Sequence, residues 1–158
     1  KMLTVEELLV EINLLDIRPE FICIDHLHFL KKSGKGATED LDEIILKLQN
    51  MAKELSVPVL VIAHVRKLNS DRAPELDDLR DSSSLAQVPS VVMFLHREKN
   101  ENQTNGYLSN NGTLFIPKNR IQGKTGALKF EIVDKSKIQF SSSVKGMTTG
   151  EVRKIFDY

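Results

Sequence analysis

Polar side chains that could take part in chemistry follow three apolar runs of the sequence. Asp25, His26 and His28 follow FICI, His64 comes at the end of the run that begins VPVLVI, and His96 follows VVMFL. A carboxylate at the end of a buried strand is typical of a Walker B motif, which holds Mg²⁺ near nucleotide phosphates. Many other strands end on Asp only to begin a loop, so both interpretations of Asp25 stay open.

His26 and His28 alternate with apolar residues, so on a strand both imidazoles would lie on one face. Two such histidines could begin a transition-metal site, but the sequence offers no third ligand at a suitable spacing, since Cys23 is expected to point inward. The alternative is that one imidazole packs inside and the other is partly exposed. The spacing favours this second interpretation.

Residues 122–126, QGKTG, contain part of a phosphate-binding P-loop pattern. The full pattern needs G-x-x-x-x-G-K-[ST] between a strand and a helix, whereas Lys118 stands five residues before Gly123 and the following ALKFEIV alternates as a strand does. No other Gly-Lys-Ser/Thr occurs in the chain. We therefore predict a turn between two strands, and no Walker A motif.

Lys118 and Arg120 flank Asn119 at the end of a predicted strand, so both cations would project in the same direction. Two cations at a strand end could reach phosphates bound by a neighbouring subunit, as an arginine finger does. A solvated basic edge is the alternative interpretation.

The elements that must position these residues begin with an alternation of helices and strands. Helices are predicted over 4–15, where Thr4 and Glu7 form a capping box, and from about 39 to 55, with Thr38 as the cap. The other expected elements are buried strands at 21–25, 57–62 and 91–95, a short helix or turn pair at 77–87, a polar excursion with Asn-Gly turn signals at 96–112, and antiparallel strands at 113–117, 127–133 and 137–140. This order predicts an α/β fold with a mostly parallel sheet and an antiparallel C-terminal edge. Ligands collect at the carboxyl ends of parallel strands, where we expect Asp25, His64 and His96.

The composition is that of an ordinary soluble domain. The chain has 158 residues, of which 41% are apolar and 28% charged. Lys plus Arg and Asp plus Glu are both 22, so the net charge predicts neither a nucleic-acid nor a membrane partner. With one cysteine, no signal-like start and no long apolar run, we expect a soluble, cytoplasmic protein without disulfides. Because Lys1 stands where a Met would begin a gene product, we expect a piece of a longer chain.

Several longer motifs occur together and in one order: AKELSVPVLVIAH, LDDLRDSSSLAQVPSVVMFLHRE and TLFIPKNRIQGKTGALKFEI. With them, residues from about 4 to 140 resemble the C-terminal RecA-like motor domain of DnaB-family replicative helicases. FICIDHLHFL looks like the Walker B segment of that family, with His28 roughly where the family has Gln. The resemblance implies a partial RecA-like domain over residues 1–140 and a linker and tail over 141–158.

The resemblance implies roles for the matching residues. Asp25 would be the Walker B carboxylate that holds Mg²⁺, and His64 would contact the γ-phosphate of ATP and couple hydrolysis to DNA. Lys118 and Arg120 would be fingers that reach the ATP site of a neighbouring subunit. Cations of two loops would hold the backbone of single-stranded DNA without reading its sequence: Arg66, Lys67 and Arg72, and Lys31, Lys32 and Lys35.

The implied parent protein is an ATP-driven hexameric ring with ATP and Mg²⁺ as cofactors, single-stranded DNA as partner, a primase or loader as a further partner, and no membrane partner. The chain departs from the family at Ala86-Gln87, where Glu-Gln is common, and at Val88-Pro89-Ser90, where Asp-Ala-Asp is common. The Walker A segment and the catalytic glutamate of the family would precede the residues seen here. We therefore expect no ATPase activity from the isolated chain.

Two other functions stay open on the sequence. The missing P-loop and the changes at Ala86 and Val88 favour a non-catalytic RecA-like module that binds single-stranded nucleic acid or a protein partner. A RecA/RadA-type recombinase or a KaiC-like ATPase would share the core fold. The pattern K-x-R-x-x-G-x-T-G from Lys118 to Gly126 points to the helicase branch instead.

Overall fold

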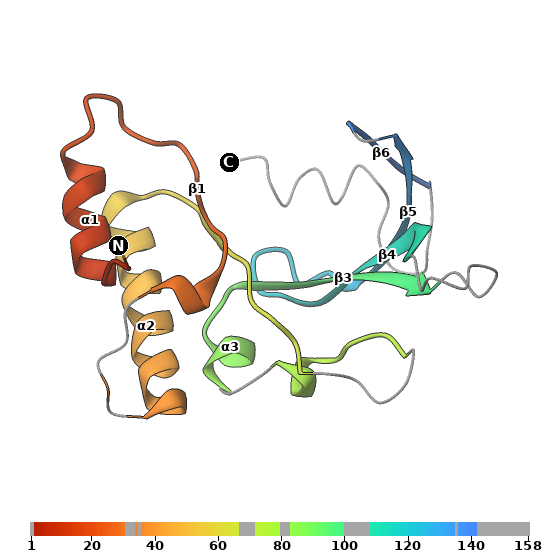
Figure 1. Cartoon of the computed structure of the whole chain (residues 1–158), viewed down its shortest axis with the longest axis horizontal. Coiled ribbons are helices and arrows are strands. Elements are labelled where there is room, and N and C mark those ends of the chain that lie inside the picture. The colour runs from red at the N-terminus through yellow and green to blue at the C-terminus, as the bar shows by residue number, and fades with distance from the viewer. Residues whose placement is uncertain are drawn as a thin grey trace. The chain divides into compact units, whose positions relative to one another are not determined.

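The structure is a computed structural model that describes residues 2–30, 34, 36–66, 72–79, 83–99, 108–134 and 136–141. Its elements in chain order are α1 (Val5–Asn13), β1 (Ile22–Ile24), η1 (Leu27–Phe29), α2 (Ala37–Leu55), β2 (Val59–Val61), η2 (Leu76–Asp78), α3 (Ser84–Gln87), β3 (Val91–Lys99), β4 (Leu108–Asn119), β5 (Gly126–Asp134) and β6 (Lys137–Phe140) (Figure 1). The chain divides into two compact units. The first comprises Lys1–Arg66 with Asp77–Pro89, and the second comprises Lys67–Leu76 with Ser90–Tyr158.

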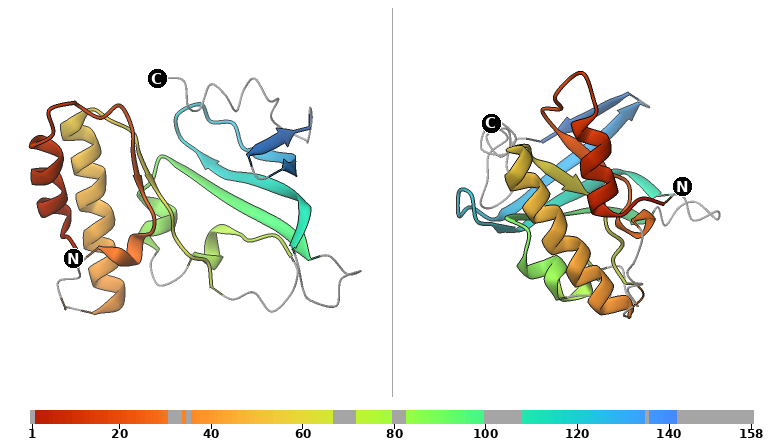
Figure 2. Two further views of the ribbon diagram at one scale, coloured as in Figure 1. Left: turned by 45° about the horizontal axis from the view of Figure 1, so that its top comes forward. Right: turned by 90° about the vertical axis from the view of Figure 1, so that its left-hand side faces the viewer.

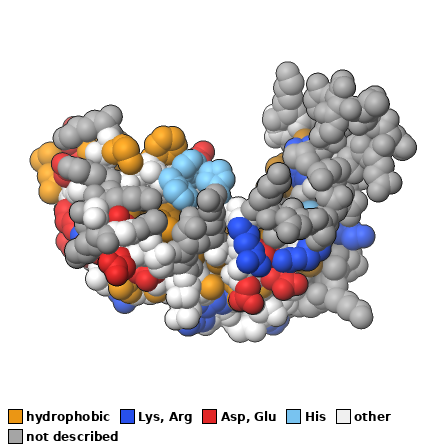
Figure 3. Space-filling view, turned by 60° about the horizontal axis from the view of Figure 1, so that its bottom comes forward, with side chains coloured by type: hydrophobic (Ala, Val, Ile, Leu, Met, Phe, Trp, Pro, Cys, Tyr) orange, Lys and Arg blue, Asp and Glu red, His pale blue; other side chains and the backbone are white. Residues whose placement is uncertain are grey.

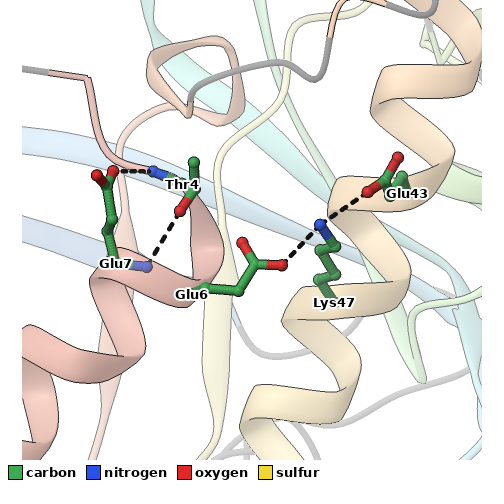
Figure 4. A network of polar contacts seen from close by, with 5 residues as sticks. All are labelled: Thr4, Glu6, Glu7, Glu43 and Lys47. Atoms are coloured by element: carbon green, nitrogen blue, oxygen red, sulfur yellow. Dashed lines mark hydrogen bonds and ion pairs between the residues drawn. The ribbon is translucent and has the colours of Figure 1, made fainter.

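Helices α1 and α2 lie side by side in the first unit (Figure 2). The predicted capping box of α1 is confirmed, because Glu7 N–H donates to Thr4 Oγ1 at 3.1 Å and Thr4 N–H donates to Glu7 Oε2 at 2.9 Å. Lys47 of α2 contacts Glu6 of α1 at 2.6 Å and Glu43 at 2.7 Å (Figure 4). The hydrogen bond from Lys47 lowers the pKa of Glu6, and those to Glu43 and Glu6 raise the pKa of Lys47. Exposed pairs of this kind contribute little to stability.

The start of α2 differs from the sequence prediction. The helix begins at Ala37 with Gly36 as its N-cap, and no side chain caps it, so the predicted cap at Thr38 is wrong. Gly36 has a φ of 148°, a conformation that side-chain-bearing residues rarely adopt. Glu39 and Asp40 instead place carboxylates in the first turn, where they interact favourably with the positive end of the helix dipole.

The core of the first unit lies between the helices and a two-stranded parallel sheet. The apolar face of α2 is buried against α1 and against β1 and β2; its buried residues are Leu41, Ile44, Ile45, Leu48, Met51 and Leu55. Ile22 and Ile24 of β1 pack against this core, while Cys23 between them is exposed. The prediction of a strand buried on both faces, with Cys23 pointing inward, is therefore wrong. Alternate side chains of a strand point to opposite faces, and α2 covers only one of them.

The second unit is a four-stranded antiparallel sheet in the order β3-β4-β5-β6. Leu128 and Phe130 of β5 are buried while Lys129 and Glu131 are exposed, the alternation expected for a sheet covered on one face. Ile116 of β4 and Leu128 are fully buried and form the centre of its core. β3 pairs antiparallel with β4 and thus differs from the third parallel strand expected at 91–95.

One turn prediction is wrong, because Asn110, Asn111 and Gly112 lie inside β4. A side chain at Gly112 would collide with the ring of Phe130 and would come within 2.7 Å of the carbonyl oxygen of His96. Glycine is therefore present to let neighbouring strands approach closely, and not to make a turn.

The turn predicted at QGKTG is confirmed. Residues 120–125 connect β4 to β5, Gly123 adopts a φ of 70°, and a strand follows where a P-loop would need a helix. The α/β class is also confirmed, with a parallel pair of strands in one unit and an antiparallel sheet in the other. Within the described part of the chain, no helix is long and apolar enough to cross a membrane.

Candidate functional site

The parallel pairing of β1 and β2 places the residues that follow both strands at one edge. Ile62 N–H donates to Ile24 O at 3.0 Å, and Leu27 N–H donates to Ile62 O at 2.9 Å. These bonds continue the ladder past the ends of the strands. They hold the segment around Asp25 against the segment that leads to His64, as expected for the carboxyl ends of parallel strands.

Three imidazoles meet at this edge. The ring centroids of His26 and His64 are 4.5 Å apart, those of His26 and His28 are 5.4 Å apart, and those of His28 and His64 are 5.9 Å apart. His26 also stacks on Phe29 at 4.6 Å. The histidines form one surface patch in Figure 3, which we call the histidine cluster (His26, His28 and His64).

The histidine cluster is built by packing. Its rings meet edge to face, and Nδ1 of His26 accepts a hydrogen bond from His28 N–H at 3.2 Å, which orients the His26 ring. Among the residues that the structure describes, no group of three or more His, Cys, Asp or Glu side chains is arranged to hold a metal ion. Cys23 is exposed, yet it takes no part in such a group.

Asp25 follows β1 directly and its side chain is exposed beside the histidine cluster. The peptide bond between Asp25 and His26 is cis. Magnesium ions usually take one or two carboxylates from a protein and complete their shell with water and substrate phosphates. An exposed carboxylate on a strand end, such as that of Asp25, fits this donor set.

Arg66, two residues after His64, is tied to a buried acid. Its Nε donates to Oδ1 of Asp78 at 2.9 Å, and its backbone N–H donates to the carbonyl oxygen of Asp78, also at 2.9 Å. Val65 and Leu79 form an antiparallel bridge next to this pair. The side chain of Asp78 is 0% exposed and that of Arg66 is 58% exposed. Arg66 therefore compensates a buried negative charge, a function that the sequence prediction did not include.

Of the other cations predicted to hold nucleic acid, the structure describes Arg72. Arg72 is exposed, with Nη1 donating to the carbonyl oxygen of Ala73 at 3.0 Å and lying 3.9 Å from Glu75. Lys31, Lys32, Lys35 and Lys67 lie outside the described residues.

The two predicted finger residues, Lys118 and Arg120, belong to the second unit. Lys118 is near the end of β4, and Arg120 begins the turn that follows. Burial lowers the pKa of Lys118, and the positive charge of Arg120 lowers it further. Arg120 forms no ion pair with a carboxylate among the described residues. Asn119, between the two cations, is 5% exposed.

His96 is placed differently from the prediction. β3 continues to Lys99, so His96 lies inside an antiparallel strand, opposite Thr113. It is not at the end of a parallel strand, and it belongs to the second unit, whereas the histidine cluster belongs to the first.

The segment that departs from the expected family pattern is short and well anchored. Leu85 of α3 is buried in the core of the first unit, and Nε2 of Gln49 donates to Val88 O at 3.2 Å. Ala86 and Val88 thus stand where α3 packs beside α2.

Two residues that the sequence reasoning passed over take part in this architecture. Asp78 lies in the quoted motif LDDLRDSSS, but nothing in its local pattern shows that it would be buried. Asn119 carries a weak signal, because an Asn at the end of a strand followed by a glycine within four residues is typical of a side-chain-capped turn.

Known proteins resemble this chain over most of its length. The family described as "DnaB-like helicase C terminal domain" matches residues 2–142. A replicative DNA helicase DnaB of Treponema pallidum is 33% identical over 87 residues, which are 54% of this chain and 20% of that protein. A replicative DNA helicase DnaB of Mycoplasma pneumoniae is 29% identical over 124 residues, 71% of this chain and 26% of that protein. A probable plasmid replicative DNA helicase of Chlamydia trachomatis is 30% identical over 107 residues, 65% of this chain and 22% of that protein.

The fold agrees with this relationship. A solved structure of a DnaB-like replicative helicase, described with its interactions with primase, superposes with a TM-score of 0.69 at 23% sequence identity and covers 83% of this chain and 33% of its own. The chain spans about a fifth to a quarter of the length of these curated relatives. The family match over residues 2–142 and the RecA-like arrangement lead to one conclusion: this chain belongs to the DnaB-like helicase C-terminal domain family.

Proposed function

We propose that this chain is part of an ATP-driven, hexameric replicative DNA helicase motor. The observation that carries the proposal is the family match over residues 2–142, together with Asp25 and the histidine cluster at the carboxyl ends of two parallel strands. In this proposal the chain contributes to each ATP site one carboxylate, one phosphate-contacting imidazole and two cations.

Asp25 and His64 would act on the nucleotide from the same edge of the sheet. Mg²⁺, when bound, neutralises charge on the terminal phosphates of ATP. Asp25 holds that ion through its exposed carboxylate, and His64 donates a hydrogen bond to the γ-phosphate. His26, whose centroid is 4.5 Å from that of His64, limits the orientations that the His64 ring can take.

Lys118 and Arg120 would act on a site of the neighbouring subunit. A guanidinium offers a fork of donors that suits a phosphate, and in related phosphoryl-transfer enzymes such a finger stabilises the charge that builds up in the transition state. Arg120 is exposed and forms no ion pair with a carboxylate among the described residues, so its charge is available for an anion.

Single-stranded DNA would contact the segment after His64 and the predicted loop at residues 31–38. Arg72 is exposed, and Arg66 keeps 58% of its side chain exposed while it pairs with Asp78. Cations that grip phosphates give affinity that falls with salt and does not depend on sequence. Lys31, Lys32, Lys35 and Lys67 belong to this proposal by their positions in the sequence alone.

A primase is a candidate partner of the parent protein, because the related solved structure is described with its interactions with primase. We propose this partner by kinship alone and assign it no surface of this chain.

Subunit complementation tests the proposal on the full-length protein that contains this chain. Asp25→Asn removes the carboxylate that holds Mg²⁺, and Arg120→Ala removes the finger, so each variant alone should lose DNA-stimulated ATP turnover by about 10³-fold. In a mixed ring some interfaces would combine an intact Asp25 with an intact Arg120. Turnover of the mixture should therefore exceed that of either variant alone.

A matched control is Asn110→Ala, which changes an exposed residue of β4. It should leave turnover unchanged. Turnover at the original level in Arg120→Ala alone would contradict the finger, and a mixture no more active than its components would contradict a site shared between subunits.

A further inference from the structure

The backbone around Arg120 is held on both sides. Its own N–H donates to the carbonyl oxygen of Ser90, just before β3, at 2.8 Å. The next two backbone N–H groups, of Ile121 and Gln122, both donate to Oδ1 of Asn119 at 3.1 and 3.2 Å. Gly123 N–H donates to the carbonyl oxygen of Asn119 at 2.9 Å. The residue that carries the guanidinium therefore sits in a turn whose amide groups are paired one after another.

Asn119, which accepts the hydrogen bonds of this turn, is buried. Its side chain is 5% exposed, and its Nδ2 is buried without a hydrogen-bond partner among the described residues. A buried donor without a partner lowers stability. The oxygen of the same amide is the acceptor for the backbone N–H groups of Ile121 and Gln122.

An amide also differs from its isostere, the carboxylate, in charge. Aspartate would accept the same two N–H groups and would present no orphan donor. It would also bury a negative charge, because residue 119 is 5% exposed. Asparagine supplies the same acceptor without a buried charge.

We propose that Asn119 is a positioning residue that fixes the backbone of Arg120, so that the guanidinium projects from a rigid turn. This inference rests on the proposed function, because it assigns the turn to the finger of a shared ATP site. Positioning of this kind matters for turnover because misplacement of a reacting group by about 1 Å can cost about 10²-fold in rate.

The first test concerns the turn and does not need ATP. Amide hydrogen exchange of Ile121 and Gln122 is measured in the unsubstituted full-length protein and in its variants Asn119→Ala, Asn119→Ser and Asn110→Ala. Loss of the acceptor in Asn119→Ala should speed exchange of both amides at least about fivefold, the factor that corresponds to one ordinary hydrogen bond. Serine keeps a short neutral acceptor that can cap a turn, so Asn119→Ser should restore part of the protection. Asn110→Ala, an identical change at an exposed site, should leave these amides as they were.

The second test measures ATP turnover of the same variants. Asn119→Ala should lower kcat by about 10- to 100-fold with KM for ATP nearly unchanged, because the finger acts in the transition state and not in substrate binding. Asn119→Ser should recover part of kcat, in proportion to its recovered protection. A variant that merely destabilised the fold would lower the amount of active protein without this parallel between protection and kcat.

The outcomes separate the two proposals. Unchanged exchange of Ile121 and Gln122 in Asn119→Ala would overturn the positioning role. Faster exchange with unchanged kcat, in a protein that Arg120→Ala inactivates, would also overturn it while the finger stands. Full turnover in Arg120→Ala would overturn the finger itself, and with it the role of Asn119 in catalysis.

Discussion

The two units of this chain each hold one arginine from the proposed site, and they do so in opposite ways. In the first unit the guanidinium of Arg66 pairs with Asp78, whose side chain is completely buried. In the second unit the backbone of Arg120 is fixed through Ser90 and Asn119, whereas its guanidinium forms no ion pair with a carboxylate among the described residues.

This difference distinguishes a cation that stabilises the fold, Arg66, from a cation whose charge is available to a ligand, Arg120. The charge of Arg66 offsets a buried carboxylate, so removal of Arg66 mainly affects folding. The guanidinium of Arg120 forms no ion pair with a carboxylate among the described residues, while hydrogen bonds hold the turn that carries it. The presence of an arginine in a basic segment therefore indicates less about its function than the group with which its guanidinium pairs.

The comparison assumes that each unit holds its arginine by its own packing, and core substitutions test this assumption. Leu41→Ala in α2 and Leu128→Ala in β5 each remove a side chain that is at most 1% exposed, so each should lower the free energy of unfolding by about 3 kcal/mol. Hydrogen exchange in the full-length protein should show faster opening mainly in the unit that carries the substitution. Equal acceleration in both units would mean that they unfold as one cooperative body.

Removal of each arginine in turn sharpens the contrast. Arg66→Met takes the charged partner from Asp78 and should destabilise by about 1–3 kcal/mol, less than for a fully buried pair because Arg66 is half exposed. Arg120→Met should change the free energy of unfolding by less than about 0.5 kcal/mol, as is usual at exposed sites. Urea unfolding of both variants measures this directly. A larger loss in Arg120→Met than in Arg66→Met would reverse the assignment.

Salt dependence of single-stranded DNA binding compares Arg66, which lies 2.9 Å from the buried Asp78, with Arg72, which lies 3.9 Å from the exposed Glu75. Each phosphate contact contributes about 0.7 to the slope of log affinity against log salt. We expect Arg72→Met to lower that slope by about this amount and Arg66→Met to lower it less, because Asp78 competes with the DNA for Arg66. Titrations at several salt concentrations give the slopes, and equal losses would show that Asp78 does not restrict Arg66.

The smallest expected effect concerns the pH dependence of the second unit. Burial and Arg120 lower the pKa of Lys118 below its ordinary value. Between the folded and unfolded pKa values the unfolded chain binds more protons, so stability rises with pH in that window, while turnover that needs charged Lys118 falls. Lys118→Arg should move the alkaline limb of the pH–rate profile upward, because a guanidinium keeps its proton there. An unchanged limb would exclude Lys118 as its source.

Local patterns predicted the local features of this fold well. The capping box at Thr4 and Glu7, the turn at QGKTG and the alternation in β5 depend on residues that are close in sequence, and all three are confirmed. The motif order also identified the family, because several segments had to agree at once.

Features that depend on distant neighbours were not predictable in this way. An apolar run does not reveal whether one or both faces of a strand are covered, so Cys23 was expected inside and is exposed. The signal Asn110-Asn111-Gly112 is typical of turns, but here the glycine is needed because Phe130 of the next strand lies against it. Likewise, the buried state of Asp78 depends on how the segment around Arg66 returns to it, which no local pattern contains.

The exposure of Cys23 has a practical consequence. It is the chain's sole cysteine, it is exposed, and it stands two residues before Asp25 on β1. A thiol-reactive fluorophore or spin label would therefore attach at one known position in this chain, close to the carboxylate proposed to hold Mg²⁺. The fluorescence or magnetic resonance signal of such a probe would report whether nucleotide is bound.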